Sequence, residues 1–368
     1  MKIKALFILL FAIQFCASPP PKNPGEEYDN IARMCFNDPC FISTLQTAIA
    51  KAEISIDLAL YGFTDERITG FLNDAVSRGV QIRAVSDYDS ENQSGFQNLI
   101  HQNIPVVFGN SSGIMHNKYI IIDKKYLITG SANLTKSIAV NFNHMLLIRS
   151  KALCQIYSRD FENFFSRRFF SNQKSFPGAQ NPIEFFPVSV GQYKIYPLFT
   201  PYSSAYELKT YPDPENPGET FNYQNIFTRI LPYIEKAENS IRILAYSLTE
   251  PVFIASLKKS ASRNVELKAL MDRNQYLAAS AQTQAQLIDL GNTAQVMICR
   301  PPNEGLLHHK AIWIDRKIQM AGSFNFSKNA MESNDENFLI IENAANLTEI
   351  FDREMDRIMP YCKKIQDF

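Results

Sequence analysis

The sequence predicts an α/β fold built from two similar halves. Apolar runs that suit strands alternate with amphipathic runs that suit helices, and this alternation returns 185 residues further along the chain. The 368 residues are 45% hydrophobic, which is enough to bury a large core in two domains. We expect a signal segment with a Pro-rich linker at residues 1–25, the halves at 26–170 and 191–368, and a linker at 171–190.

The N-terminus has the composition of an export signal. Two lysines in the first four residues precede an apolar run over residues 5–15, which is too short to span a bilayer well. Cys16 ends this run and is a candidate for lipid attachment in a bacterial lipoprotein, although Phe15 stands where a small residue is usual. We therefore expect export to the medium, the periplasm or the cell envelope, and anchoring through Cys16 stays open.

The first half follows a helix–strand–helix–strand order. Residues 41–52 have the pattern of a helix and residues 54–61 that of a strand. The next helix ends at Arg78-Gly79 and carries an apolar face made of Ile68, Phe71, Leu72, Ala75 and Val76. A further strand over residues 80–85 completes a strand–helix–strand unit, which favours a layered α/β domain.

The region between the halves is rich in aromatic residues. Eight phenylalanines lie between residues 161 and 186 and are interrupted by Arg167-Arg168. A lipid-facing segment is one interpretation, but a closing helix that packs on the next domain is the more common one. A strand over residues 193–198 then opens the second half, and the Pro-rich residues 211–218 suit a surface insertion.

The second half repeats the first at two slightly different offsets. Residues 241–246 and Asp272 match residues 56–61 and Asp87 at an offset of 185, whereas later residues match at 192. The second half therefore holds a net seven extra residues between Asp272 and the later match. We expect that segment, around residues 276–293, to lie near the site entrance and to shape specificity.

Cysteine usage and charge limit the classes of protein. Cys35 and Cys40 flank a turn-forming Asn-Asp-Pro stretch and could close a local disulfide in an exported protein, although the pairing stays open. The other cysteines receive no pairing, and no cysteine–histidine spacing fits a zinc site. The 37 basic and 37 acidic residues give zero formal charge, so no net field draws the protein to nucleic acid or to anionic membranes.

One stretch occurs twice without a gap. In each copy an apolar run suits a strand, a charged two-residue turn (Lys124-Lys125 or Arg316-Lys317) follows, and a second strand comes next. The paired residues, each 192 positions apart, are His116 and His308, Lys118 and Lys310, Asp123 and Asp315, Ser131 and Ser323, and Asn133 and Asn325. Such strict duplication argues against two unrelated core histidines.

The spacing brings a histidine and a lysine together. Side chains alternate along a strand, so His116 and Lys118 share one face whereas Asp123 points to the other. In the same way, His308 and Lys310 share one face and Asp315 points to the other. An imidazole attacks phosphorus or moves a proton, and an ammonium stabilises charge on the phosphate oxygens. Serines and asparagines after the second strand add hydrogen-bond donors. The pattern therefore predicts a site for an anionic substrate, and neither a metal nor another cofactor is expected.

These residues resemble the signature of the phospholipase D superfamily, H-x-K-x(4)-D followed by G-S-x-N, and both copies match it. The resemblance implies two α-β-α sandwich halves that pack as a pseudo-dimer around one shared active site. It also implies a monomer with an internal pseudo-two-fold axis that cleaves phosphodiesters without a metal through a phosphohistidine. Catalytic roles then fall to His116, Lys118, Asp123, His308, Lys310 and Asp315, and substrate binding to Ser131, Asn133, Ser323, Asn325 and Glu336.

Three functions remain to be separated. The leading hypothesis is a phospholipase D-type enzyme that hydrolyses a phospholipid to phosphatidate and a free head group, with peripheral membrane contact. The alternative is a secreted endonuclease of the same superfamily, which would be expected to carry a basic groove, and no strong Lys/Arg cluster supports one. The third is a binding module without catalysis, against which two intact motif copies argue.

The two copies differ after their motifs, and this difference predicts unequal histidines. Glu336 resembles the acidic residue that orients an active-site imidazole in the superfamily. The matching position in the first half is His144 without a gap, or Asn143 if one residue is skipped, and neither is a carboxylate. A carboxylate makes an imidazole a better base and nucleophile. By resemblance we expect attack by His116 and leaving-group protonation by His308. This assignment works best if Glu336 reaches across the interface to His116, and which histidine Glu336 orients stays open at this point.

Overall fold

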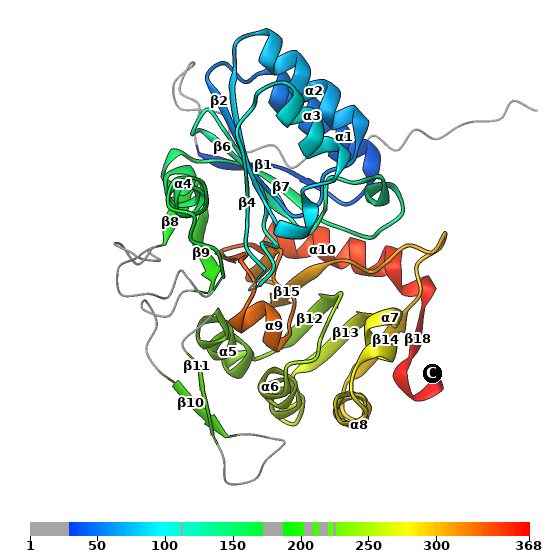
Figure 1. Ribbon diagram of the computed structural model, residues 1–368. Helices are drawn as coiled ribbons and strands as arrows, with labels where there is room; N and C mark the ends of the chain where they lie inside the picture. The colour runs from blue at the N-terminus through cyan, green and yellow to red at the C-terminus, as the bar shows by residue number, and fades with distance from the viewer. Residues whose placement is uncertain (1–28, 112, 172–186, 202–208, 213–219, 224–225) are drawn as a thin grey trace, which may run out of the picture.

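The protein folds into two α/β halves that pack against each other (Figure 1). The structure, a computed structural model, describes residues 29–111, 113–171, 187–201, 209–212, 220–223 and 226–368. The predicted signal segment and Cys16 lie outside these residues, as do residues 213–218 of the predicted insertion and 172–186 of the aromatic stretch. In the part that is described, no helix is both long and apolar enough to cross a membrane.

Each half is centred on a mixed sheet with the same core order of strands. The first sheet runs β1 (Asn30–Cys35), β7 (Met145–Arg149), β6 (Tyr126–Gly130), β5 (Lys118–Ile122), β2 (Ser55–Leu60), β3 (Gln81–Ser86), β4 (Val106–Phe108). The second runs β18 (Cys362–Lys364), β14 (Gln295–Cys299), β13 (Glu266–Asp272), β12 (Ser240–Ala245), β15 (Lys310–Ile314), β16 (Ile318–Gly322), β17 (Glu336–Glu342), β9 (Tyr193–Thr200), β8 (Val188–Val190). The six strands from β7 to β4 correspond in order to those from β17 to β14. A separate hairpin pairs β10 (Lys209–Pro212) with β11 (Thr220–Tyr223).

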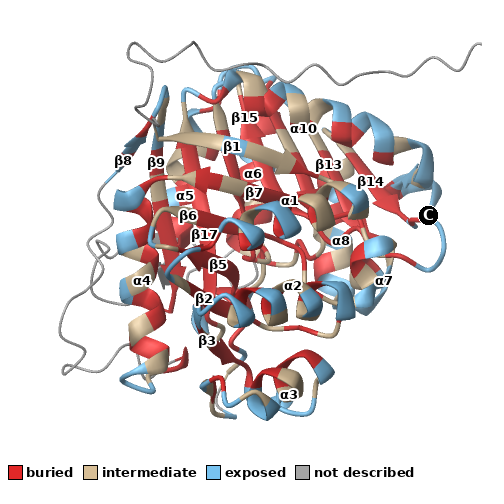
Figure 2. Ribbon diagram, turned by 90° about the horizontal axis from the view of Figure 1, so that it is seen from above, coloured by how far each residue is buried: buried red, intermediate tan, exposed pale blue. Residues whose placement is uncertain are grey.

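Helices cover the sheets of both halves. The first half contains α1 (Asp38–Ala50), α2 (Glu66–Ser77), α3 (Ser94–His101) and α4 (Lys151–Phe165). The second contains α5 (Ile226–Lys236), α6 (Pro251–Ala261), α7 (Arg273–Ala278), α8 (Ala281–Gly291), α9 (Lys328–Glu332) and α10 (Ala345–Ile358). The strands are buried whereas the helices expose their outer faces (Figure 2). The predicted strand–helix–strand units are confirmed, with ends that differ by a few residues.

Local sequence explains where these helices begin and end. Asn37 caps α1 by accepting the backbone N–H of Cys40, and Asp65 caps α2 by accepting that of Arg67. Glu250 does the same for α6, whose first residue is Pro251. Gly79 follows α2 with a φ of +87°, a conformation that glycine adopts without strain and that turns the chain into β3.

The two faces of the first sheet belong to different cores. Ile56, Leu58 and Ile120 pack beneath α1 and α2 in a core confined to the first half. Tyr119 and Ile121, on the other face, belong to a larger core that includes α4 and continues through the second half. Since burial of this shared core holds the halves together, the structure fits the predicted pseudo-dimer.

The aromatic stretch and the predicted linker have a structural role where they are described. Phe161 and Phe164 of α4 are fully buried, and the ring of Tyr157 lies 4.8 Å from that of Phe199 in the second half. The closing-helix interpretation is therefore confirmed for α4. The linker boundary was placed too late, because β8 at Val188–Val190 already pairs with β9 of the second sheet.

The net insertion in the second half lies mostly away from the site. Residues 276–293 fall on α7 and α8, and α8 packs against α6 and the C-terminal residues. Only α7, which follows Asp272, approaches the site, because Gln275 lies within hydrogen-bonding reach of the Tyr246 hydroxyl. The expectation that the whole segment lies at the site entrance is wrong for α8.

Two disulfides join neighbouring elements. Cys35–Cys40 links β1 to α1, a pairing that the sequence left open, and Cys299–Cys362 links β14 to β18. Cys154 is free and buried in α4. Sequence spacing gave no reason to pair cysteines 63 positions apart, since only the folded sheet brings β18 beside β14.

Candidate active site

Each histidine–lysine pair lies at the start of a β-hairpin. Lys118 begins β5, which pairs with β6, and Lys310 begins β15, which pairs with β16. His116 and His308 lie two residues earlier, so each imidazole shares the face of its lysine. The predicted turns are shifted by one residue: Asp123-Lys124 and Asp315-Arg316 occupy the central positions, with positive φ at all four residues. Two consecutive positive φ angles characterise a type I′ turn, whose twist matches that of the flanking strands.

Asp123 and Asp315 lie at the far ends of these hairpins and hold backbone in place. The Asp123 carboxylate accepts the N–H groups of Glu53, Ile54 and Ser55 at 2.8–3.0 Å. Burial alone would raise the pKa of Asp123, but these three donors outweigh it and keep the pKa below the usual value. Asp315 repeats the arrangement with residues 238–240. We therefore assign both aspartates a structural role and withdraw the predicted catalytic one.

The two histidines are brought together because the halves exchange backbone hydrogen bonds. The His116 N–H donates to the carbonyl of Asp335 at 2.9 Å, and the His308 N–H donates to that of Phe142 at 2.8 Å. The segment after each motif thus runs beside the histidine of the other half. The Lys118 ammonium and His116 both contribute to lowering the pKa of His308, which shows that the two pairs form one cluster.

The imidazoles have different partners. His116 Nδ1 lies 2.8 Å from Glu336 Oε1, and Ser323 Oγ donates to Glu336 Oε2 at 2.5 Å. His308 Nδ1 lies 2.9 Å from Asn143 Oδ1, to which Ser131 Oγ donates at 3.0 Å. Glu336 and Asn143 are therefore structural counterparts, one residue skipped, and each reaches the histidine of the other half.

Glu336 is completely buried, which excludes a solvent-facing side chain. The ungapped candidate, His144, instead packs behind the site, where its Nδ1 lies 3.2 Å from that of His309. The contact that corresponds to His144–His309 under the pseudo-two-fold axis is a hydrogen bond of 2.9 Å that Asn337 Nδ2 donates to Asn117 Oδ1. The residue after each motif histidine thus pairs across the interface.

The lysines are buried beside tyrosine rings. Lys118 Nζ donates to the His116 carbonyl at 2.7 Å, and Lys310 Nζ donates to the His308 carbonyl at 2.9 Å. Each ammonium also lies over an aromatic face, 5.3 Å from the ring centre of Tyr61 and 4.7 Å from that of Tyr246. The same two rings contact the imidazoles.

Burial dominates the electrostatics of the cluster. It lowers the pKa of His116 to about 4 although Glu336 acts in the opposite direction. The pKa of His308 falls well below its usual range through burial and then through Lys310 and Lys118. Burial also lowers the pKa of Lys118 to about 7 and that of Lys310 well below its ordinary value. Burial of the cluster thus disfavours positive charge, which a bound anion would compensate.

The predicted substrate-binding residues fall into two groups. Asn133 and Asn325 follow the hairpins, and their Oδ1 atoms are buried without a hydrogen-bond partner in the part of the chain that is described, so each can accept a hydrogen bond, whereas their predicted role as donors to the substrate stays a prediction. Ser131 and Ser323 are fully buried and hold Asn143 and Glu336, which in turn hold the histidines. We infer that the two serines position the imidazoles instead of binding substrate.

Sequence reasoning missed four residues that complete the site. Asp87 accepts the N–H of Met115 at 2.7 Å and Asp272 that of Leu307 at 2.9 Å, so each carboxylate fixes the residue before a motif histidine. The other two are the tyrosines beside the lysines. Asp87 and Asp272, like Tyr61 and Tyr246, are pairs at the offset of 185, but this offset alone does not predict that they contact the motif residues.

The described residues contain no group of three or more His, Cys, Asp or Glu side chains arranged to hold a metal ion. The cluster combines two imidazoles, two lysines and amide groups, a donor set suited to a phosphate anion. The sequence model described as "Cardiolipin synthase, PLD-like domain" matches residues 45–165 and 230–359, one segment in each half. The chain belongs to the phospholipase D superfamily.

Similar proteins agree with this membership. The phospholipase D of Rickettsia prowazekii is 38% identical over 146 residues, which are 39% of this chain and 70% of that protein. The human mitochondrial cardiolipin hydrolase is 28% identical over 184 residues, 46% of this chain and 72% of that protein. The crystal structure of phosphatidylserine synthase from Haemophilus influenzae covers 92% of this chain and 90% of its own with a TM-score of 0.68. At 13% identity that structure supports the fold alone. As a superfamily member, this protein is a phosphodiesterase-type hydrolase.

Proposed function

We propose that the protein hydrolyses a phospholipid to phosphatidate and a free head group through a phosphohistidine on His116. The observation that carries the proposal is the unequal support of the imidazoles, a carboxylate on His116 and an amide on His308. The names of the similar proteins, a phospholipase D and a cardiolipin hydrolase, support a phospholipid substrate.

In the first step, His116 acts as the nucleophile. Glu336 accepts a hydrogen bond from Nδ1–H, which leaves the lone pair on Nε2 free to attack phosphorus. The P–Nε2 bond forms while the bond from phosphorus to the head-group oxygen breaks. Protonated His308 gives its Nε2 proton to that oxygen, and the lysines stabilise the charge on the phosphoryl oxygens.

In the second step, the roles of His308 reverse. Neutral His308 removes a proton from water, whose oxygen attacks phosphorus and breaks the P–Nε2 bond. Phosphatidate leaves and both imidazoles return to their starting states. Because burial lowers the pKa of His308, its protonation in this cycle depends on the phosphodiester anion, whose negative charge favours the protonated form when substrate binds.

The order of roles is tested in a single turnover with substrate labelled in the phosphatidyl part, quenched in alkali, in which phosphohistidine survives. His308→Asn should accumulate labelled protein, and His116→Asn should not. The opposite pattern would move the nucleophile to His308 and refute the role assigned to Glu336.

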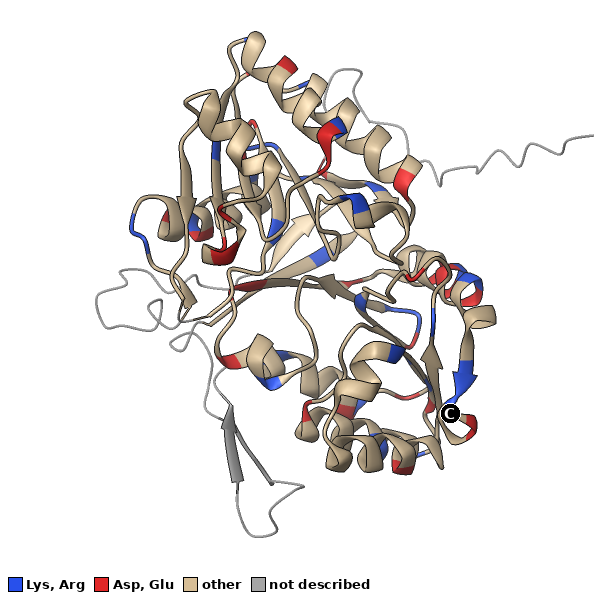
Figure 3. Cartoon of the chain, turned by 45° about the vertical axis from the view of Figure 1, so that its right-hand side comes forward, with Lys and Arg blue, Asp and Glu red and all other residues tan. Residues whose placement is uncertain are grey.

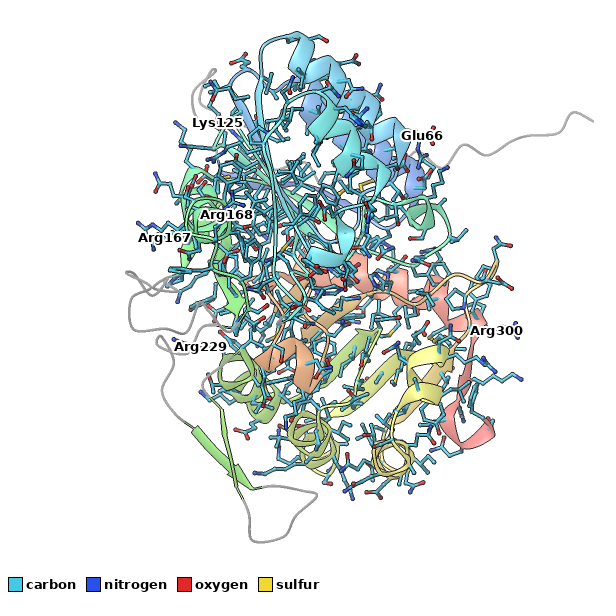
Figure 4. The ribbon with its side chains drawn as sticks, in the orientation of Figure 1. Glu66, Lys125, Arg167, Arg168, Arg229 and Arg300 are labelled. Atoms are coloured by element: carbon cyan, nitrogen blue, oxygen red, sulfur yellow. A yellow bond between two sulfur atoms is a disulfide. The ribbon has the colours of Figure 1, made fainter. Side chains whose placement is uncertain are left out.

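The substrate class is tested by offering phosphatidylcholine vesicles and single-stranded DNA in excess chelator. Cleavage of the lipid is expected, whereas cleavage of DNA alone would establish the endonuclease alternative. Lys, Arg, Asp and Glu are interspersed over the view in Figure 3, and Arg167 and Arg168 lie at the outer end of α4 (Figure 4). Neither picture favours a continuous basic track for a nucleic-acid backbone. Loss of activity that zinc or magnesium restores would contradict a metal-free mechanism.

The proposal includes an exported monomer that contacts membranes peripherally. Two disulfides support an oxidising compartment. One shared site in a single chain supports a monomer, and separately expressed residues 26–170 should be inactive unless they dimerise. Cell fractionation and light scattering test the two statements, and a purely cytosolic or obligately dimeric protein would contradict them.

A further inference from the structure

A second polar hollow lies between α10 and the strands β12, β13 and β15. Its volume is about 210 Å³, and it is lined by Ser240, Arg242, Lys268, Trp313, Arg316, Asp352, Met355 and Asp356. The hollow is at the turn end of β15, six residues from Lys310, which corresponds to roughly 20 Å along an extended strand. It is therefore separate from the catalytic cluster.

At the corresponding place in the first half, protein side chains occupy the space. Arg83 occupies the position of Lys268, since β2 pairs with β3 in the same register as β12 with β13. Its guanidinium lies 2.8 Å from Asp57 and 2.9 Å from Glu162. The guanidinium also lies 4.9 and 4.8 Å from the ring centres of Phe161 and Phe165, which stack on each other. The site is thus neutralised and filled by the protein itself.

The second half has lost most of that closure but keeps one carboxylate, because Asp356 follows Met355 as Glu162 follows Phe161. The counterpart of Asp57 is Arg242, so a cation stands where the first half has the carboxylate partner. Met355 lines the hollow together with Lys268, at the place where Phe161 lies beside Arg83 in the first half. Lys268 Nζ contacts Met359 Sδ at 3.8 Å, which is a weaker contact than the ion pairs of Arg83. The substitutions leave space beside Lys268 and put a cation where the first half has the carboxylate partner of Arg83.

The charges in the hollow are divided between paired and unpaired groups. Arg242 is paired with Glu266 at 2.7 Å, and Asp352 accepts the indole N–H of Trp313 at 2.8 Å. Among the described residues, Lys268 and Arg316 form no ion pair, and neither does Asp356. Within the described part of the chain, two cations (Lys268 and Arg316) and two carboxylates (Asp352 and Asp356) therefore line the hollow without an ion-pair partner.

We propose that this hollow is a second binding site for a phosphate group, distinct from the catalytic site and independent of the proposed function. Lys268 and Arg316 supply the charge and hydrogen-bond donors, and Arg242 adds a third cation at the wall. The small volume suits a phosphate with a short attached group, either a soluble phosphate ester or the head group of an anionic lipid such as phosphatidate.

The chain provides its own reporter for this site. It contains one tryptophan, Trp313, which lines the hollow. We would titrate the full-length protein with inorganic phosphate and with glycerol 3-phosphate at constant ionic strength and follow tryptophan fluorescence. Sedimentation with phosphatidylcholine vesicles, with and without phosphatidate, tests the lipid source.

The test variant is Lys268→Gln with Arg316→Gln, and the matched control is Lys51→Gln with Lys124→Gln, two lysines of the first half outside the hollow. We expect a saturable response in the native protein and the control, a Kd at least tenfold higher in the test variant, and equal phosphodiesterase activity in all three. A response to soluble phosphate alone identifies a free ester, and sedimentation with phosphatidate alone identifies a lipid. No saturable binding by either route, binding unchanged in the test variant, or an equal loss in the control would overturn the proposal.

Discussion

Replacing Glu336 with glutamine tests the asymmetry of the active site most directly. The new amide would keep the size of the side chain and leave an oxygen for the Ser323 hydroxyl and for His116 Nδ1–H, but it would remove the negative charge. Glu336 raises the pKa of His116 by its charge and by its hydrogen bond, both against a strong effect of burial. In Glu336→Gln the pKa of His116 should therefore fall further below about 4.

The magnitude follows from the contact distance and the charge that develops on the imidazole. When Nε2 bonds to phosphorus the ring becomes cationic, with Nδ1 at 2.8 Å from the carboxylate. At an effective dielectric constant of about 20, the Coulomb energy at this distance is at most about 6 kcal/mol. Replacing a charge-assisted hydrogen bond by a neutral one costs at least about 1 kcal/mol. A loss of about 3–4 kcal/mol lies between these bounds, and it slows phosphohistidine formation roughly 10²- to 10³-fold.

Asn143→Ala is the matched variant in the other half, because it removes only a neutral hydrogen bond to His308. We expect Asn143→Ala to raise the activation free energy by about 1 kcal/mol, which lowers the single-turnover rate tenfold or less. Single-turnover rates with a chromogenic phosphodiester measure both effects, and urea unfolding checks that each variant is folded. The reasoning fails if Glu336→Gln loses less than tenfold, or if Asn143→Ala loses as much as Glu336→Gln.

Three further predictions concern the groups around this contact and the disulfides. Because the mechanism uses protonated Lys118, whose pKa burial lowers to about 7, and protonated His308, whose pKa lies well below its usual range, kcat/KM should already decline as the pH rises toward 7, whereas kcat should decline only at higher pH; a flat kcat/KM up to pH 9 would contradict this. Tyr61→Leu should lower kcat/KM about three- to thirtyfold by removing the aromatic face, and Tyr61→Phe should restore it; equal losses would indicate the hydroxyl instead. Removing the Cys299–Cys362 bridge by paired serines should cost about 4 kcal/mol in urea unfolding, against about 2 kcal/mol for Cys35–Cys40, because it closes a longer loop; the reverse order would refute the loop-entropy argument.

The sequence was informative wherever the two copies could be compared. The constant offset of the motifs predicted two halves, and strand periodicity, a local property, predicted a common face for His116 and Lys118. The shared site was implied by the family resemblance. The turn was misplaced by one residue, because two positive φ angles at Asp123 and Lys124 are not evident from composition.

The contacts across the interface could not be predicted in the same way. Glu336 lies 220 positions from the histidine it holds, and Asn143 lies 165 positions from its own, so only the packing of the halves joins them. The choice between Asn143 and His144 depended on whether one residue is skipped in the alignment of the two halves. A shift of one residue moves a side chain to the opposite face of the strand, and the burial of one face in the folded protein decides the register. The pairing of Cys299 with Cys362 likewise depended on the position of an edge strand.

The crossed backbone bonds, from His116 to Asp335 and from His308 to Phe142, also bear on the direction in which substrate binds. In a dimer of identical halves, both histidines would have the same partner, and a phosphodiester would bind in two symmetry-related orientations of equal energy. Joining the halves in one chain allowed the two supporting residues to diverge into Glu336 and Asn143. Under the proposed mechanism that divergence removes the degeneracy: only a substrate whose head group faces His308 reacts, whereas in the symmetric dimer either orientation would react with the two histidines exchanging roles.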